Sequence, residues 1–273
     1  GDNVYIVSPT ERKNNEKTQI IRLPGCTILK PRIGNIQKTN LIEKGITTIT
    51  LEWLIKSAIK LYWQNVKFDL VLFSTPPITL TKVIQYIKKR DNARTYLLLK
   101  DIFPQNAVDL GILNYTGWKS PLYHFFRRKE KKLYMLSDRI GCMSMANVDY
   151  VINHNSEIKP EDVEVCPNSI DIIDKSITED TRVALRSKYG IPLKKKVFIY
   201  GGNLGKPQGI PFIIDCLREC KKIEDAYFLI VGDGTEYGKL ADFIKSEKPE
   251  NVKLLKWLPK DEYDSMIAAC DIG

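Results

Sequence analysis

The sequence predicts an α/β chain made of two doubly wound domains. Short β-branched runs alternate with amphipathic stretches, which is typical of a parallel sheet covered by helices. The alternation breaks off in a charged, irregular stretch after Pro167–Asp171 and restarts after Gly190. In the second half, the apolar runs Val197–Tyr200 and Tyr227–Val231 each lead into glycine. The break between the two alternating regions predicts the domain boundary.

The first domain is predicted to span residues 1–172. Its segment Ser8–Asn40 is polar and punctuated by glycine and proline, which indicates a long loop with partial order. The expected strands are Val4–Val7, Thr47–Leu51, Asp69–Phe73, Thr95–Leu99, Arg139–Met143 and Glu164–Cys166. The expected helices are Glu52–Asn65, Thr79–Arg90, Leu122–Ser137 and Met145–Asn153. Because the chain begins at Gly1, without methionine and directly before a strand, the first strand of the domain is expected to be missing.

The second domain is predicted to span residues 173–273. Its expected strands are Val197–Tyr200, Tyr227–Val231 and Val252–Leu255. Its expected helices are Thr178–Lys188, Pro211–Lys222, Glu236–Lys245 and Asp261–Ala269. A typical sheet has about five to six strands, and a further strand begins at Ala269–Gly273. The sequence therefore predicts an incomplete second domain, in a chain cut at both ends.

Composition describes an ordinary globular protein with a basic surface. Lys and Arg number 42 against 33 Asp and Glu, giving a net charge of +9. Such a surface either attracts polyanionic partners or serves solubility alone. No uncharged apolar run reaches the roughly 18 residues of a membrane span, and no signal peptide is visible. The six cysteines form no C-x-x-C pair, which predicts reduced, buried thiols in a cytoplasmic protein.

Two glycine-rich segments, Gly201–Gly209 and Gly232–Gly234, follow predicted strands. Neither fits the G-x-G-x-x-G fingerprint or a P-loop, which disfavours NAD and ATP. Each segment alone is either a ligand site or a tight turn without a ligand. Two of them at corresponding strand ends favour a bound nucleotide or nucleotide-sugar, because ligands bind outside the carboxyl edge of such sheets. Lys206 and Gln208 are predicted to reach its diphosphate.

Metal is not expected at this site. The sequence contains no Asp-x-Asp pair, the usual carboxylate arrangement that holds a divalent cation against a diphosphate. Backbone dipoles and cations such as Lys206 would then neutralise the diphosphate. The sequence predicts metal-independent binding, with no cofactor.

Eight segments in this order resemble the retaining glycosyltransferases of family 4, in the bacterial branch that builds capsule, O-antigen or colanic-acid repeat units. They are Ser74–Pro77, Lys100–Pro104, Ser137–Ile140 with Ser144, Pro167–Asp171, Tyr200–Gly209, Val231–Glu236, Asn251–Leu255 and Ala268–Ile272. The resemblance implies the GT-B fold, with two Rossmann-like domains facing a cleft. It also implies that a sugar passes from a nucleotide-sugar donor to a glycan or lipid-linked acceptor with retention of configuration, in cell-surface polysaccharide biosynthesis.

The resemblance also assigns residues. Gly202, Asn203, Gly205 and Lys206 match the family's diphosphate turn. A second set of residues lies where the family binds the base and ribose of the donor: Gly232, Asp233, Gly234, Trp257 and Leu258. Thr75 and Pro76 are placed on the acceptor side.

The sequence departs from the family in two places. The family's acidic motif, two glutamates eight positions apart, would come after Gly273, so this fragment alone is predicted to be inactive. Many members carry an Arg and a Lys-Gly where this chain has Asn203 and Gln208-Gly209.

Asp101 is the candidate catalytic residue, because it follows a predicted strand at the cleft edge. It either orients or deprotonates the acceptor hydroxyl, or caps the next backbone amides. The two histidines, His124 and His154, are expected to be structural or exposed. The basic, aromatic segment 121–136 either lies on anionic lipid, at the inner face of the membrane, or is a solvated helix face.

Two other functions remain open for the same turns. One is a GT-B-fold sugar-nucleotide epimerase, and the other is a non-catalytic nucleotide-sugar-binding protein. Nucleic acid is not predicted as a partner, because the basic residues are scattered and no aromatic RNA-binding motif or zinc framework is present.

Overall fold

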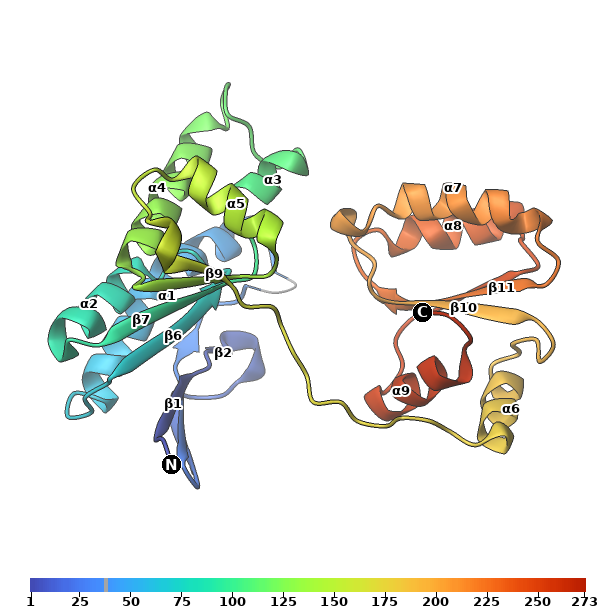
Figure 1. Ribbon diagram of the computed structural model, residues 1–273, viewed down its shortest axis with the longest axis horizontal. Coiled ribbons are helices and arrows are strands. Elements are labelled where there is room, and N and C mark those ends of the chain that lie inside the picture. The colour runs from blue at the N-terminus through green and yellow to red at the C-terminus, as the bar shows by residue number, and fades with distance from the viewer. Residues whose placement is uncertain (37–38) are drawn as a thin grey trace. The chain divides into compact units, whose positions relative to one another are not determined.

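The computed structural model describes residues 1–36 and 39–273. The chain divides into two compact units, Gly1–Ser169 and Ile170–Gly273 (Figure 1). The sequence placed the boundary a few residues later, between 172 and 173. Each unit has its own apolar cores, so each is described by itself.

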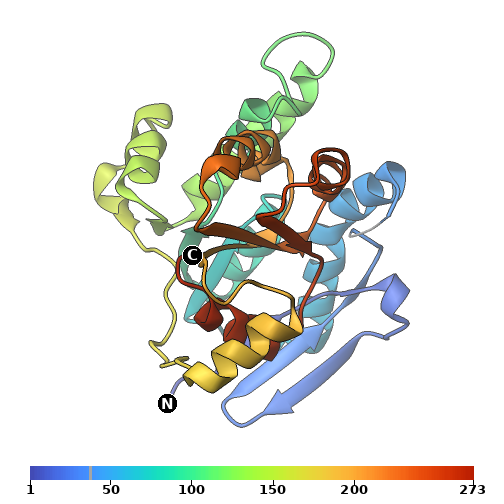
Figure 2. The same cartoon turned by 90° about the vertical axis from the view of Figure 1, so that its right-hand side faces the viewer.

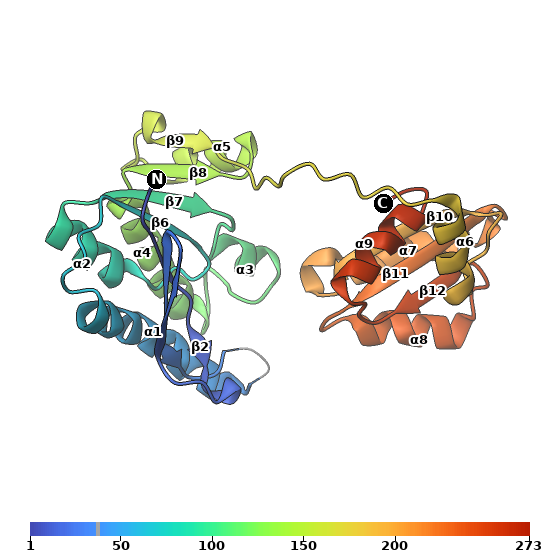
Figure 3. The ribbon, with the colours of Figure 1, turned by 90° about the horizontal axis from the view of Figure 1, so that it is seen from below.

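The first unit is built on a parallel sheet of four strands, in the order β6-β7-β8-β9 (Figure 3). These strands are β6 (Leu70–Thr75), β7 (Arg94–Leu99), β8 (Arg139–Cys142) and β9 (Val163–Val165). The connecting helices are α2 (Thr81–Asp91), α3 (Gln105–Asp109), α4 (Ser120–Leu136) and α5 (Met145–His154). Apart from the short α3, all of these elements were predicted, with small shifts of their ends.

One predicted strand is wrong. Thr47–Leu51 lies inside a long helix, α1 (Leu41–Tyr62). The β-branched residues suggested a strand, but Asn40 caps the helix by accepting a hydrogen bond from the backbone N–H of Glu43 at 2.8 Å. The buried side chains also recur at helical spacing, namely Thr47, Leu51, Glu52, Ile55, Ala58 and Ile59. Packing of this face overrides the low helix propensity of the β-branched run.

The predicted loop Ser8–Asn40 is also wrong over most of its length, and residues 37 and 38 lie outside the described residues. The antiparallel strands β3 (Gln19–Leu23) and β4 (Cys26–Lys30) form a hairpin, and β4 pairs in parallel with β1 (Val4–Val7). Its turn uses Gly25 at a φ of 69°, a conformation that glycine adopts without strain. Two further short strands pair with each other, β2 (Thr10–Glu11) and β5 (Arg32–Ile33), and the 3₁₀ turn Arg12–Asn14 follows β2.

The second unit has a three-stranded parallel sheet covered on both faces. Its strands are β10 (Lys196–Asn203), β11 (Ala226–Asp233) and β12 (Val252–Leu255). On one face lie α7 (Ile210–Glu219) and α8 (Tyr237–Glu247), and on the other lie α6 (Glu179–Lys188) and α9 (Lys260–Ala269) (Figures 1 and 2). Ile272 pairs in parallel with Phe198 on the free side of β10. All of these strands and helices were predicted.

The cysteines differ from their prediction in burial. All six are free thiols, but only Cys142 is buried and Cys216 is exposed on α7. In the part of the chain that the structure describes, no helix is both long and apolar enough to span a bilayer.

Candidate functional site

The carboxyl ends of β10 and β11 form the centre of the candidate site. The two strands stay paired through the glycines, with Gly202 opposite Gly232 and Asn203 opposite Asp233. The sequence ended these strands at Tyr200 and Val231, whereas the structure continues both into the glycine segments. The turn of the first segment therefore begins at Leu204.

Glycine is required here by close approach of the backbone. A Cβ on Gly232 would overlap the carbonyl oxygen of Gly202 and lie 3.1 Å from its carbon. A Cβ on Gly234 would lie 2.5 Å from the carbonyl oxygen of Leu204. Gly202 has a φ of 147°, which side-chain-bearing residues rarely adopt. The two glycine segments are in direct contact, so they form one surface.

Hydrogen bonds fix the turn after β10. The N–H of Leu204 donates to the carbonyl of Asp233 at 3.0 Å, and its carbonyl accepts from the N–H of Glu236 at 2.8 Å. The Gln208 side chain accepts from the N–H of Gly205 at 3.1 Å, and the N–H of Gln208 donates back to the Gly205 carbonyl at 3.1 Å. Gln208, a predicted diphosphate contact, thus closes the turn from within.

The exposed part of this surface is polar. Gly202, Asn203, Lys206 and Asp233 are exposed, whereas Gly205 and Gly232 are buried. The carboxylate of Asp233 accepts from the N–H of Gly234 at 2.9 Å. Beyond Gly209, which has a φ of 61°, α7 begins with Pro211 in its first turn. The first turn of a helix presents unpaired N–H groups and a partial positive charge toward any group placed there.

The segment after β12 brings an aromatic side chain to the same edge of the sheet. Leu255 pairs with Val231, one residue before Gly232. Trp257 is 77% exposed, while Leu258 packs against the core beneath α9. Lys256 lies 5.4 Å above the ring of Tyr237, at the start of α8.

Sequence reasoning missed Tyr263 of α9. A Cβ on Gly201 would overlap the Tyr263 hydroxyl and lie 2.6 Å from the ring carbon that carries it. A side chain at position 201 would therefore have to displace the end of the Tyr263 side chain, which comes from a helix on the far face of the sheet. The sequence offered no signal for this contact, because it depends on how α9 packs.

In the first unit, the predicted acceptor-side residues and Asp101 lie at one sheet edge. Thr75, 1% exposed, ends β6 and donates from its hydroxyl to the backbone carbonyl of Asp101 at 3.1 Å. Asp101 and Pro76 are exposed. Thr75 thus ties the end of β6 to the segment after β7, and Asp101 carries the exposed carboxylate.

The histidines match their prediction, since His124 and His154 are both exposed. His154 stacks on Tyr150 with 3.9 Å between ring centroids. Among residues 1–36 and 39–273, no group of three or more His, Cys, Asp or Glu side chains could hold a metal ion.

The fold of this chain is GT-B, as the resemblance implied. The chain superposes on Anabaena HepE, solved in complex with UDP-glucose, with a TM-score of 0.61 and 17% identity, over 89% of this chain and 58% of that one. It superposes on sucrose-phosphate synthase of Thermosynechococcus elongatus with a TM-score of 0.66 and 13% identity, over 98% and 64% of the two chains.

The second unit carries the family signal. Residues 181–272 match the family model described as "Glycosyl transferases group 1", so this unit is a glycosyl transferases group 1 domain. The matched residues contain both glycine segments, Trp257 and Tyr263.

Two curated proteins are homologous to the chain. "Probable glycosyltransferase WbjE" of Pseudomonas aeruginosa is 25% identical over 86% of this chain and 57% of its own length. "Putative colanic acid biosynthesis glycosyl transferase WcaI" of Escherichia coli K12 is 24% identical over 76% and 49%. The chain therefore spans about half the length of the curated relatives it matches.

Proposed function

We propose that the chain is part of a glycosyltransferase that passes a sugar from a nucleotide-sugar donor to a glycan or lipid-linked acceptor, with retention of configuration, in cell-surface polysaccharide biosynthesis. The observation that carries this proposal is the contact between the two glycine segments at one sheet edge, within a group 1 domain. The names of WbjE and WcaI, and the UDP-glucose bound to HepE, support it.

The donor diphosphate is proposed to lie over Gly202 and Asn203, before the first turn of α7. The helix dipole and its N–H groups attract anions, and Lys206 adds a positive charge next to this turn. No metal ion is invoked, because these groups supply the charge themselves. Gly232 and Gly234 contribute bare backbone, and the exposed Trp257 can stack on the base or ribose.

Asp101 is proposed to accept or orient the proton of the acceptor hydroxyl. It is the exposed carboxylate after β7, and the Thr75 hydrogen bond holds its backbone at the sheet edge. A carboxylate in such a place can act as a general base. Pro76 and Thr75 would then shape the acceptor side.

Donor binding is tested by thermal shift with UDP, GDP and ADP, each in the presence of EDTA. We expect one nucleotide to stabilise the protein, since stabilisation follows the logarithm of ligand excess over Kd. Lys206→Ala should weaken binding of that nucleotide about 10- to 150-fold, because a charge-assisted contact contributes about 1.5–3 kcal/mol. Lys245→Ala, at an exposed position of α8, is the matched control. A strict magnesium requirement for binding would contradict the proposed site.

Asp101→Asn tests the acceptor-side role. We expect turnover in the complete protein to fall about 10²–10⁴-fold, while the thermal shift with nucleotide stays unchanged. Asp109→Asn is the control, since Asp109 is also exposed but ends α3. Unchanged turnover in Asp101→Asn would contradict the role at the acceptor hydroxyl and would favour the alternative, in which Asp101 caps the next backbone amides.

The location proposed for this activity is the cytoplasmic face of a membrane. A lipid-linked acceptor would present its sugar there, and the basic segment 121–136 is the one for which the sequence left lipid contact open beside a solvated helix face.

A further inference from the structure

The positive charge of the chain is concentrated in one layer of helices. The residues of α1, α2 and α4 include twelve Lys or Arg and four Asp or Glu, a net charge of +8, whereas the whole chain carries +9. The basic residues looked scattered in sequence because these helices are separated by strands. In space, α2 packs between α1 and α4.

The acidic side chains of these helices offset only part of this charge, and acids outside them pair with two more of the cations, Lys88 with Asp138 at 2.8 Å and Lys131 with Glu157 at 3.1 Å. Glu52, Asp91 and Glu130 are 7%, 8% and 3% exposed, and burial raises the pKa of Glu130 although Arg127 opposes it. Their ion pairs are Glu43 with Arg12 at 2.7 Å, Glu52 with Lys129 at 3.4 Å, Asp91 with Arg90 at 2.6 Å and Glu130 with Arg127 at 2.5 Å.

A groove of about 600 Å³ lies on the outer side of α2, where every charged lining residue is cationic. Lys82 and Lys89 line it from α2, Lys56 from α1 and Lys132 from α4. Tyr86 forms part of its wall, with the ammonium groups of Lys56 and Lys60 lying 5.3 and 5.1 Å from the ring centroid. A concave surface of this charge is complementary to phosphate groups.

Apolar side chains continue the same surface on α1. Ile46, Ile49, Trp53, Lys56 and Lys60 are spaced three and four residues apart, so they share one face of the helix. The three apolar members are 59%, 75% and 66% exposed. An exposed apolar stripe next to a basic groove is unusual for a face that meets only water.

Helix α4 repeats the pattern. Leu122, Phe125, Lys129 and Lys132 follow the same spacing, and Leu122 and Phe125 are 49% and 46% exposed. In both helices, the apolar residues precede the lysines.

The three helices run in the same direction, so the apolar ends lie together. Glu52 of α1 accepts from the N–H of Lys82 at the start of α2, and Lys129 of α4 reaches the same carboxylate. At the other end, Arg90 of α2 donates to the carbonyl of Trp63, 3.1 Å away and just past α1. Lys88 likewise donates to the carbonyl of Leu136 at the end of α4, at 3.0 Å.

We propose that this outer face of α1, α2 and α4, here called the basic helical face, docks on an anionic lipid bilayer. The groove takes phosphate headgroups, and the apolar side chains beside it enter the interface between headgroups and acyl chains. A soluble phosphate or a nucleic acid would use the lysines but would gain nothing from the exposed side chains of Ile49, Trp53 and Phe125. Amphipathic, lysine-rich surfaces of this kind are what anionic membranes bind.

The docking proposal stands apart from donor binding, but it has a consequence that rests on the proposed function. The helices begin where the strands end, so the apolar end of the face lies on the same side of the first unit as Thr75 and Asp101. A docked protein would hold its acceptor side near the bilayer.

The test is co-sedimentation with phosphatidylcholine vesicles, with and without phosphatidylglycerol. We expect binding only to the anionic vesicles, falling as salt is added. Each lysine near an anionic surface contributes a factor of about five to binding, so Lys82→Glu/Lys89→Glu should weaken it at least about 25-fold. Lys17→Glu/Lys245→Glu makes the same change in net charge at exposed positions elsewhere and should bind nearly as the parent.

Trp53→Ser separates a bilayer from other polyanions. It should weaken vesicle binding while the unfolding midpoint and the nucleotide thermal shift stay unchanged. Equal binding to neutral vesicles, or equal loss in both charge variants, would overturn the proposal. So would tight binding of a DNA or RNA duplex to the parent, together with undiminished vesicle binding by Trp53→Ser. None of these results depends on whether the second unit binds a nucleotide.

Discussion

Replacing Gly232 by alanine is expected to destabilise the second unit by about 1–3 kcal/mol and to abolish nucleotide binding. The added Cβ would overlap the carbonyl oxygen of Gly202. That oxygen belongs to the backbone of a paired strand, so it cannot move aside as the end of a flexible side chain could. Relief requires β10 and β11 to separate at the edge where the donor is proposed to bind.

Gly238→Ala is the matched control. Gly238 lies in α8, and an added Cβ there would meet no heavy atom within 4 Å. Gly238 is the second residue of the helix, so alanine there should stabilise the unit by less than the roughly 1 kcal/mol that it gains in a helix interior. Amide hydrogen exchange of peptides from β10 and β11, with the nucleotide thermal shift, measures both effects. If Gly232→Ala exchanges as slowly as Gly238→Ala, the two strand ends are not packed as described.

The strands of the two parallel sheets were predictable because each is a short apolar run with polar residues or glycine on either side. The runs that became β11 and β12 are almost wholly apolar, since parallel strands are covered on both faces. Their helices were predictable from the opposite signal, one buried stripe at helical spacing.

The two errors of the first unit have a common physical cause. In α1, and in the segment that forms β2 to β5, tertiary pairing decided the structure. β4 is flanked by β1 and β3, and its Leu29 is 0% exposed because it lies in one core cluster with Leu51 and Ile55 of α1. No local pattern shows either contact. Local propensity contains no information about contacts with residues that are distant in the sequence.

The location of the candidate site was predictable from the sequence, but the contacts between its side chains were not. Glycine at strand ends located the edge of the sheet. Three features of the site depend on side-chain directions, which follow only from the fold. They are the hydrogen bond from Gly205 to Gln208, the burial of Thr75 and the position of Tyr263 beside Gly201. Contacts such as these convert a glycine motif into a shaped surface.

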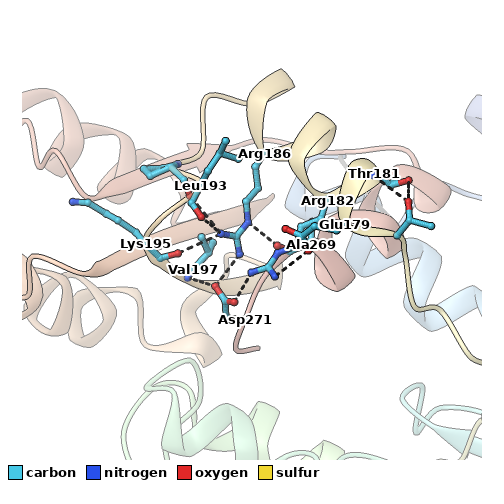
Figure 4. A network of polar contacts seen from close by, with 11 residues as sticks. Glu179, Thr181, Arg182, Arg186, Leu193, Lys195, Val197, Ala269 and Asp271 are labelled. Carbon is cyan, nitrogen blue, oxygen red and sulfur yellow. Dashed lines mark hydrogen bonds and ion pairs between the residues drawn. The ribbon is translucent and has the colours of Figure 1, made fainter.

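The second large effect is expected at Arg186, a residue of α6 whose side chain is 2% exposed (Figure 4). Its guanidinium donates to the carboxylate of Asp271 at 2.8 Å and to the carbonyl of Ala269 at 2.8 Å. It also lies within hydrogen-bonding distance of three carbonyls between α6 and β10, those of Pro192, Leu193 and Lys195. One side chain thus joins α6, the start of β10 and the end of α9.

Arg186→Met is expected to cost about 3–5 kcal/mol, because removing one partner leaves a partly buried carboxylate and several carbonyls unsatisfied. Arg182→Met is the control, since Arg182 donates to the same carboxylate at 2.6 Å but its side chain is 31% exposed. An exposed pair contributes about 1 kcal/mol or less. Urea unfolding, with hydrogen exchange of α6 and α9 peptides, measures the difference. Similar losses in the two variants would show that Arg186 is not the centre of the network.

The charge on Asp271 should make this network sensitive to acid. Burial by itself raises the pKa of Asp271, but the N–H of Val197, Arg186 and Arg182 outweigh burial and hold the pKa below its ordinary value. An unfolded aspartate titrates near pH 3.9. The carboxylate therefore stabilises the fold fully above about pH 4, and its contribution disappears as the pH falls through the lower folded pKa. Asp271→Asn should start less stable at neutral pH and lose less stability below about pH 4. Every other carboxylate titrates alike in the parent and in Asp271→Asn. If plots of unfolding free energy against pH ran parallel for the two proteins below about pH 4, Asp271 would not be ion-paired in solution.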